Sequence, residues 1–139
     1  MNYIELVNEI EALVKLAGAK SFWSGAKTGA NINYSVPFPA AEFFNTQPRA
    51  LLPSVVRYSI GMGIYGKDAH ENGGEGTLQI QSDMDELVQR FEVLLRESEA
   101  FELQERPGGA VIGVPTIRQG SKMGTGLYID FTLDVPRVC

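Results

Sequence analysis

The sequence of 139 residues has one cysteine, one histidine and no long hydrophobic run. Because the cysteine is the last residue, Cys139, we expect no disulfide framework and no thiolate metal site. No apolar segment approaches the ~20 residues that a membrane-spanning helix needs, so the sequence predicts no contact with a membrane. The start of the sequence lacks the basic region of a signal peptide, so no signal peptide is expected.

An excess of positive charge is also missing. Twelve Lys and Arg residues against 17 Asp and Glu residues give a net charge of −5. This charge argues against broad, non-specific binding to a phosphate backbone, although it leaves room for a local basic patch. A hydrophobic content of 44% with 21% charged residues is typical of globular proteins, and the length fits a single domain over residues 1–139.

A helix is predicted over residues 3–17. Asn2 can act as its N-cap, Glu5 completes a capping-box pattern, and Gly18 is suited to end the helix. The apolar residues have the three- and four-residue spacing of one helix face: Tyr3, Leu6, Val7, Ile10, Leu13, Val14 and Ala17.

Between this helix and residue 53 the patterns are weaker. Phe22 and Trp23 predict the start of a short strand, residues 25–29 a turn, and the alternation over residues 32–38 a half-buried strand. Residues 40–53 are predicted to be an irregular excursion. Its large apolar side chains must pack either on this domain or on a neighbouring subunit: Phe43, Phe44, Leu51 and Leu52.

A hairpin is predicted at the centre of the chain. Apolar residues alternate over residues 56–64, and Leu78 and Ile80 continue the alternation after a long polar loop, 66–76. Gly61 and Gly63 leave one face of the first strand nearly bare, which permits close approach by another strand or another subunit.

A second amphipathic helix is predicted to begin at the N-cap Ser82 and to end near residue 97, with Asp83, Asp85 and Glu86 in its first turn. Its apolar stripe is Met84, Leu87, Val88, Phe91, Leu94 and Leu95. Short strands are expected around residues 101–103 and 111–117, and a closing strand over residues 127–135. The predicted fold class is therefore α+β, with two amphipathic helices packed on a mainly antiparallel β-sheet and a long hairpin loop.

No motif in the sequence indicates catalysis. His70 lies in the polar loop and is expected to be solvent-exposed, and with Asp68 and Glu71 it could hold a divalent ion only weakly. The acidic residues 83, 85 and 86 are explained by the positive end of the second helix. The sequence therefore predicts no catalytic, cofactor-binding or metal residue, and a protein that is not an enzyme.

Two further features have simple explanations. Residues 25–29 resemble part of a P-loop, but Ala26 separates Gly25 from Lys27 and no helix is predicted to follow, so we interpret them as a loop. Arg118, Lys122 and Arg137 could contact a phosphate or carboxylate but are typical of solvated surface.

The order of these elements resembles that of the tail terminator and head–tail joining (neck) proteins of long-tailed bacteriophages. The similarity covers an opening helix at residues 2–17, a strand pair at 55–65 and 77–81, a helix with an acidic first turn at 83–97, and a closing strand at 126–135. It extends over most of the chain. The segment 25–53 is longer than in the shortest members of the family.

The resemblance implies a virion structural protein that forms a ring, commonly of six subunits, which caps the tail tube and receives the neck. Its partners would be copies of itself, the tail tube and neck or connector proteins, and DNA would pass through the lumen without specific binding. The protein would assemble in the host cytoplasm and reside in the virion tail or neck. A net charge of −5 is compatible with an acidic lumen.

The candidate subunit-interface residues are those of the apolar excursion and the bare strand face: Phe43, Phe44, Leu51, Leu52, Gly61 and Gly63. On this hypothesis, Phe43→Asp should prevent ring assembly while the monomer stays folded.

Two other classes of function remain open at this stage. Two helices backing an antiparallel sheet would also suit a small ligand-binding or regulatory domain of ferredoxin-like type. A small hydrolase or transferase that uses Asp and Glu together with His70 is the third possibility, and it requires His70 to be essential.

Overall fold

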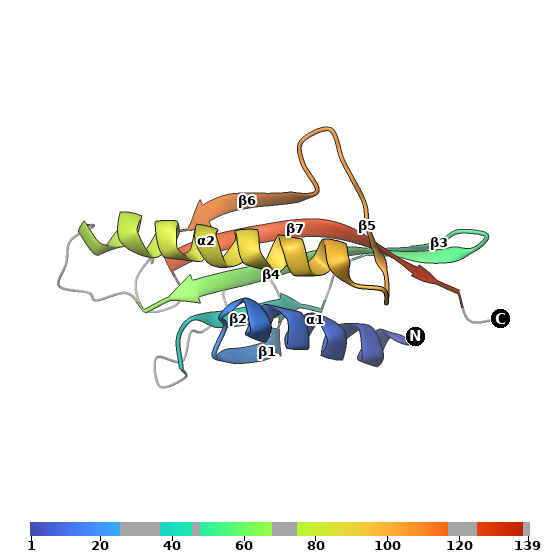
Figure 1. Ribbon diagram of the computed structural model, residues 1–139, viewed down its shortest axis with the longest axis horizontal. Coiled ribbons are helices and arrows are strands. Elements are labelled where there is room, and N and C mark those ends of the chain that lie inside the picture. The colour runs from blue at the N-terminus through green and yellow to red at the C-terminus, as the bar shows by residue number, and fades with distance from the viewer. Residues whose placement is uncertain (26–36, 46–47, 68–74, 117–124, 138–139) are drawn as a thin grey trace.

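The computed structural model describes residues 1–25, 37–45, 48–67, 75–116 and 125–137. Within these ranges the elements follow one another in the order shown by the colours of Figure 1. They are α1 (Tyr3–Ala17), β1 (Ser21–Gly25), β2 (Ala40–Phe44), β3 (Arg49–Leu51), β4 (Val55–Gly66), α2 (Glu75–Glu97), β5 (Glu102–Leu103), β6 (Val111–Thr116) and β7 (Thr125–Pro136).

Helix α1 has the bounds and caps that its sequence predicts. The side chain of Asn2 accepts a hydrogen bond from the backbone N–H of Glu5 at 2.9 Å, and the Glu5 carboxylate accepts one from the Asn2 N–H at 2.8 Å. At the other end Gly18, with φ of 130°, donates its N–H to the carbonyl of Lys15 at 3.1 Å. The predicted capping box and C-terminal glycine are therefore confirmed, and they satisfy backbone groups that a helix leaves unpaired.

The strands of the described residues belong to one open sheet of seven strands, in which β1, β2, β4, β7 and β5 are neighbours in that order. Strand β3 also pairs with β4, and β6 also pairs with β7. The long strands β4 and β7 form the centre and pair antiparallel over twelve residues each. Only β1 and β2 pair in parallel, so the predicted α+β class with a mainly antiparallel sheet is confirmed.

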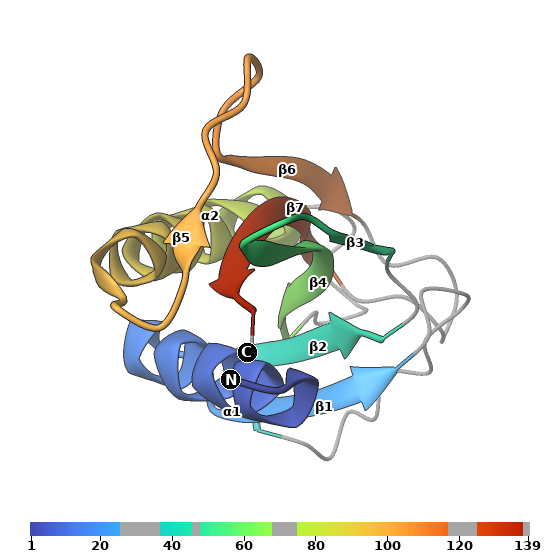
Figure 2. The same ribbon diagram turned by 90° about the vertical axis from the view of Figure 1, so that its right-hand side faces the viewer.

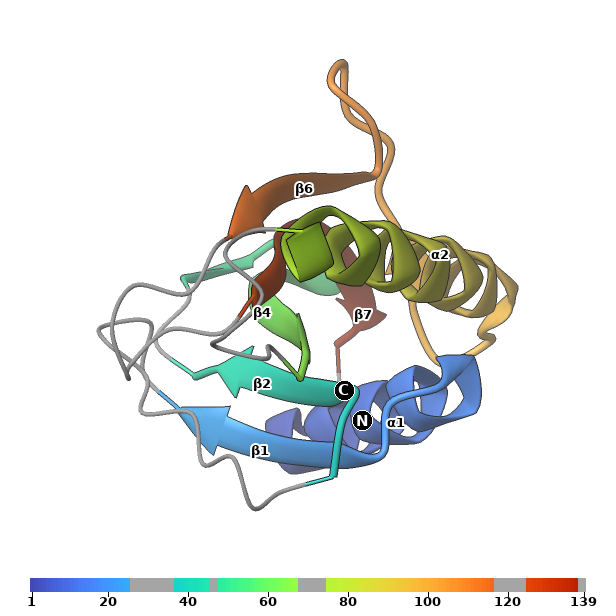
Figure 3. The same cartoon turned by 90° about the vertical axis from the view of Figure 1, so that its left-hand side faces the viewer.

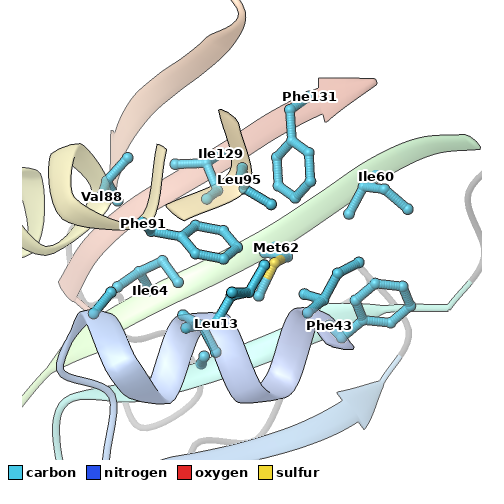
Figure 4. Close-up of a cluster of buried hydrophobic side chains, with 14 of the residues drawn as sticks. Leu13, Phe43, Ile60, Met62, Ile64, Val88, Phe91, Leu95, Ile129 and Phe131 are labelled. Carbon is cyan, nitrogen blue, oxygen red and sulfur yellow. The ribbon is translucent and has the colours of Figure 1, made fainter. Parts of the chain in front are cut away.

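Both helices lie on the same face of the sheet and run in opposite directions, as the views from its two ends and from the side show (Figures 1, 2 and 3). The hydrophobic core fills the space between the helices and the sheet, and Figure 4 shows its centre. There the rings of Phe91 from α2 and Phe131 from β7 meet edge to face, with centroids 5.8 Å apart. Met62 and Ile64 of β4 are fully buried beside them. Burial of each such side chain stabilises the fold by about 1.5–3 kcal/mol.

The segment 40–53 is not the irregular excursion that the sequence suggested. It contains β2 and β3, which both pair antiparallel with β4. Every residue of β2 is buried, so its sequence is a continuous apolar run with one glutamate and lacks the alternation that marks a half-buried strand. Periodicity in the sequence therefore does not reveal this strand.

The predicted strand at residues 77–81 is also wrong, because these residues belong to α2. Ser82 therefore does not cap the helix, and Asp83, Asp85 and Glu86 lie in its interior. Strand β4 has no free edge beside which a hairpin partner could pair: β7 pairs with it along one side, and β2 and β3 occupy the other. Ile80 instead continues the apolar stripe of α2 and packs against the core.

The other elements predicted for the second half of the chain are found in the structure. The stripe residues of α2 that are fully buried include Leu87, Phe91 and Leu95, and the short strand β5, the strand β6 and the closing strand β7 are all present. No helix of the described residues combines the length and the apolarity needed to cross a membrane. The predicted strand at 32–38 and the polar loop at 66–76 fall largely outside the described residues.

Candidate functional site

Two of the candidate interface residues, Phe43 and Phe44, are buried inside this chain, so that part of the interface prediction is wrong. Phe43 is 1% exposed and lies among the core aromatics, with its ring 6.2 Å from Tyr3 and 6.3 Å from Phe22. Phe44 is 2% exposed and points to the other face, where its ring meets Tyr128 at 5.8 Å. Neither side chain is available to a neighbouring subunit.

The glycines of β4 do not leave a face open for a neighbour either. A Cβ atom on Gly63 would lie 2.0 Å from the hydroxyl oxygen of Tyr65, because the Tyr65 side chain covers that position. Gly61 is buried as well, between Phe44 of β2 and Asp130 of β7 in the sheet register. The close approach that these glycines allow is therefore made by the chain itself.

Leu51 and Leu52 remain available at the surface. Leu51 is 69% exposed in β3, and the β3–β4 hairpin extends beyond the ends of both helices (Figure 1). The hairpin is anchored at its base, where the Arg49 guanidinium lies 4.4 Å from the centre of the Tyr3 ring. Arg137 is expected from the sequence to be solvated surface, and in the structure its guanidinium donates to the carbonyl of Leu52 at 3.1 Å.

A buried polar cluster that the sequence analysis did not predict lies on the helix-free face of the sheet. Side chains alternate along a strand, so Glu42, next to the core residue Phe43, points away from the helices. Glu42 is 2% exposed and accepts a hydrogen bond at 3.0 Å from the hydroxyl of Tyr65, and the side chain of Trp23 also hydrogen-bonds to it. A side-chain hydrogen bond links Tyr65 to Tyr128. We call Trp23, Glu42, Phe44, Tyr65 and Tyr128 the Glu42 cluster.

Two glycines make room for the Glu42 cluster. A Cβ atom on Gly25 would lie 2.5 Å from a carboxylate oxygen of Glu42, and Gly63 lies beneath Tyr65. A glutamate inside an apolar strand, with glycines on neighbouring strands, is the sequence signal that could have indicated this cluster. The pairing of β1 with β2 and of β2 with β4 was needed to bring these residues together.

Burial raises the pKa values of the three ionisable groups Glu42, Tyr65 and Tyr128 in the Glu42 cluster. It raises the pKa of the Glu42 carboxyl, and the hydrogen bonds from Tyr65 and Trp23 act in the opposite direction. Burial and then the nearby carboxylate raise the pKa of the Tyr65 hydroxyl. Burial also raises the pKa of Tyr128. Because Glu42 is almost completely enclosed, a substrate cannot reach it in this structure, and the cluster is a structural element.

The other residues that the sequence singled out are not brought into one site. His70, Asp68, Glu71, Lys27, Arg118, Lys122 and Cys139 lie outside the described residues. Within α2, Asp83 and Asp85 accept hydrogen bonds from glutamine side chains one turn away, Gln79 and Gln89. The part of the chain that the structure describes contains no group of three or more His, Cys, Asp or Glu side chains arranged to hold a metal ion.

A groove lies between α2 and β6, beside one edge of the sheet. Its volume is about 520 Å³, and it is lined on the helix by Leu78, Asp85 and Val88 and on the strand by Gly113 and Pro115, among others. Leu78 is 75% exposed there. In the described residues, β6 pairs with β7 alone, so the other edge of β6 is open beside this groove.

Comparison with protein-family models gives no match for this chain, and comparison with curated proteins gives none.

Proposed function

We propose that this protein is a virion structural subunit, a ring-forming tail terminator or head–tail connector that caps the tail tube of a long-tailed bacteriophage and joins it to the neck. Copies of the chain form the ring, with six subunits as the resemblance implies, and the tail tube and neck proteins bind its two faces. DNA passes through the lumen without specific binding. The ring assembles in the host cytoplasm and functions in the virion, with no catalytic site.

The observation that carries this proposal is the open sheet. Strands β1 and β6 lie on opposite sides of its centre, and neither has a strand on its outer side in the described part of the chain. Exposed strand edges are sites at which another chain can pair. The projecting β3–β4 hairpin, with Leu51 exposed, offers a further contact to a neighbour. These features suit a subunit that completes its surface against other copies.

The order of elements gives additional support. The opening helix, the first strand of the expected pair, the second helix and the closing strand keep the order of the phage proteins that the sequence resembles, whereas the expected second strand at 77–81 is part of α2. The amphipathic character of both helices and the polar sequence between β4 and α2 belong to the same proposed plan. The order differs from the βαββαβ order of ferredoxin-like domains, since the chain begins with a helix and its first two strands are neighbours.

The native mass of the purified protein, measured by size-exclusion chromatography with light scattering, tests the proposal. Negative-stain images of the same peak should show a closed ring with a central hole. A compact dimer without a hole would contradict the proposal.

The groove of about 520 Å³ between α2 and β6 favours one alternative, a small ligand-binding domain, because its volume is within the range of small-molecule sites. In that case a metabolite should raise the melting temperature in a saturable manner. Absence of any stabilisation across a broad metabolite panel would remove the alternative.

A further inference from the structure

The outer edge of β6 carries a defined set of backbone groups. The N–H of Gln104 donates to the carbonyl of Thr132 at 2.9 Å. The backbone N–H and C=O of Thr132 therefore point to the side of β7 on which β5 and β6 lie. Backbone groups alternate in direction along a strand, so the backbone N–H and C=O groups of Tyr128 and Asp130 point to that side too. Their partners in the register, Val114 and Ile112, therefore make the hydrogen bonds of the β6–β7 ladder.

The intervening residues of β6 direct their backbone groups outward. These are Val111, Gly113 and Pro115, which are opposite Phe131, Ile129 and Leu127. Pro115 fits this alternation, because a residue without an N–H is tolerated where the ladder needs no donor. The outer edge thus offers two N–H groups, from Val111 and Gly113, and the carbonyls of all three residues. In the described residues no strand pairs with them.

We propose that this edge is the subunit seam, and that β1 of a second copy of this chain adds to β6 and extends the sheet from one subunit to the next. This inference rests on the proposed ring. Pairing between different edges of identical chains is a head-to-tail contact, and such contacts generate rings when the rotation closes. Strand addition of this kind obtains affinity from main-chain hydrogen bonds and specificity from alternate side chains in an adjacent groove.

Strand β1 is the partner that matches. It is the end strand on the other side of the sheet and has five residues, against six in β6, whereas β3 and β5 have three and two. The α2 flank of the groove carries the carboxylate of Asp85, and the exposed Lys20 immediately precedes β1, so these two charges are complementary. In Figure 2 the loop between β5 and β6 rises above β6.

The outward N–H of Gly113 would hydrogen-bond across the seam but takes no part in the β6–β7 ladder. The variant Gly113→Pro removes this N–H and so tests the seam without disturbing the fold. The proline lacks the outward N–H but leaves the β6–β7 ladder intact, as Pro115 already does two residues further on. Gly113→Ala is the matched control: it retains the N–H, and its Cβ would meet Ile129 at 3.6 Å, an ordinary contact. Both variants should keep the wild-type circular dichroism spectrum, and the Ala variant should have the native mass of the wild-type ring.

The expected result is a ring for wild type and Gly113→Ala and a monomer for Gly113→Pro. The N–H of Asn45 donates to the carbonyl of Gly25 at 2.9 Å, so the backbone groups of Gly25 and Trp23 face β2, and those of Phe22 and Ser24 face outward. Hydrogen exchange identifies both strands: the amides of Val111, Phe22 and Ser24 should exchange at least tenfold more slowly in the ring than in the monomeric variant. A Gly113→Pro ring of wild-type mass would overturn the seam while the proposed function stands. Slow exchange in β6 without slow exchange in β1 would overturn β1 as the partner. A wild-type chain that is monomeric at every concentration would contradict the ring itself.

Discussion

The hydroxyl of Tyr65 on β4 donates a hydrogen bond of 3.0 Å to the carboxylate of Glu42 on β2, and both side chains are at most 2% exposed. A buried carboxylate depends on such donors because no water replaces them. Tyr65→Phe should therefore destabilise the protein by about 1–3 kcal/mol, measured by urea unfolding. In a Glu42→Gln background the same change should cost less. Equal costs in the two backgrounds would show that the hydroxyl and the carboxylate are not coupled.

The raised pKa of Glu42 predicts a specific pH dependence of stability. The folded state binds the Glu42 proton more tightly than the unfolded state, whose pKa is about 4.3. The contribution of this group is thus complete below that pH and is lost as the pH rises through the higher pKa of the folded state. Glu42→Gln does not titrate, so its melting temperature relative to wild type should increase between pH 4 and pH 8. A difference that is constant or decreases over this range would contradict the assignment.

Gly126, the glycine of β7, should tolerate substitution poorly. A Cβ on Gly126 would lie 1.9 Å from the backbone oxygen of Ile64, so Gly126→Ala must separate the two central strands. We expect a loss of roughly 3 kcal/mol or failure to fold, since overpacking against backbone cannot be relieved by a rotamer change. Gly113→Ala, with no contact closer than 3.6 Å, should stay within about 0.5 kcal/mol of wild type. Chemical denaturation of the two variants side by side checks this contrast.

Arg90 of α2 closes the C-terminus of α1. Its Nε donates to the carbonyl of Ala17 at 2.8 Å, which satisfies a carbonyl that the helix leaves unpaired. Arg90→Met retains the apolar stem of the side chain but removes the donor, and it should cost about 1 kcal/mol. The amides of the last turn of α1 should exchange faster with solvent than in wild type. The exchange rates of the β7 amides should change only as much as the loss of global stability requires. Unchanged exchange in α1 would argue that the carbonyl gains nothing from Arg90.

Phe43 and Leu51 are both candidate interface residues by sequence, but they differ in burial and should respond differently to substitution. Phe43→Asp should unfold the monomer, because it places an unpaired carboxylate in the core at a cost of several kcal/mol. Leu51→Asp, at a position 69% exposed, should change stability by less than about 0.5 kcal/mol while lowering the native mass of the assembly. Circular dichroism and light scattering on both variants distinguish the outcomes. An intact ring in Leu51→Asp would remove the β3–β4 hairpin from the contact.

Local sequence patterns are sufficient to predict an element when one of its faces is buried and capping or turn residues mark its ends. The helix α1 is such a case, since Asn2, Glu5 and Gly18 define both ends without help from the rest of the chain. Strand β7 is another, because its alternating residues face the core on one side only. The same patterns failed at β2, where burial on both faces removes the alternation, and at residues 77–81, whose short sequence fits two periods equally well.

Sequence patterns are therefore enough to predict the α+β class, the first helix, the buried stripe of the second helix and the closing strand, because each depends on contacts within a few residues or on a single periodicity. The folded chain is needed to establish where α2 begins, which apolar residues are buried, and that Glu42, Tyr65 and Tyr128 meet. Those outcomes depend on which strands are neighbours: β4 is paired along both edges, which leaves residues 77–81 to the helix and leaves the outer edge of β6 unpaired in the described part of the chain. Pairing between residues far apart in sequence leaves no local pattern from which it could be predicted.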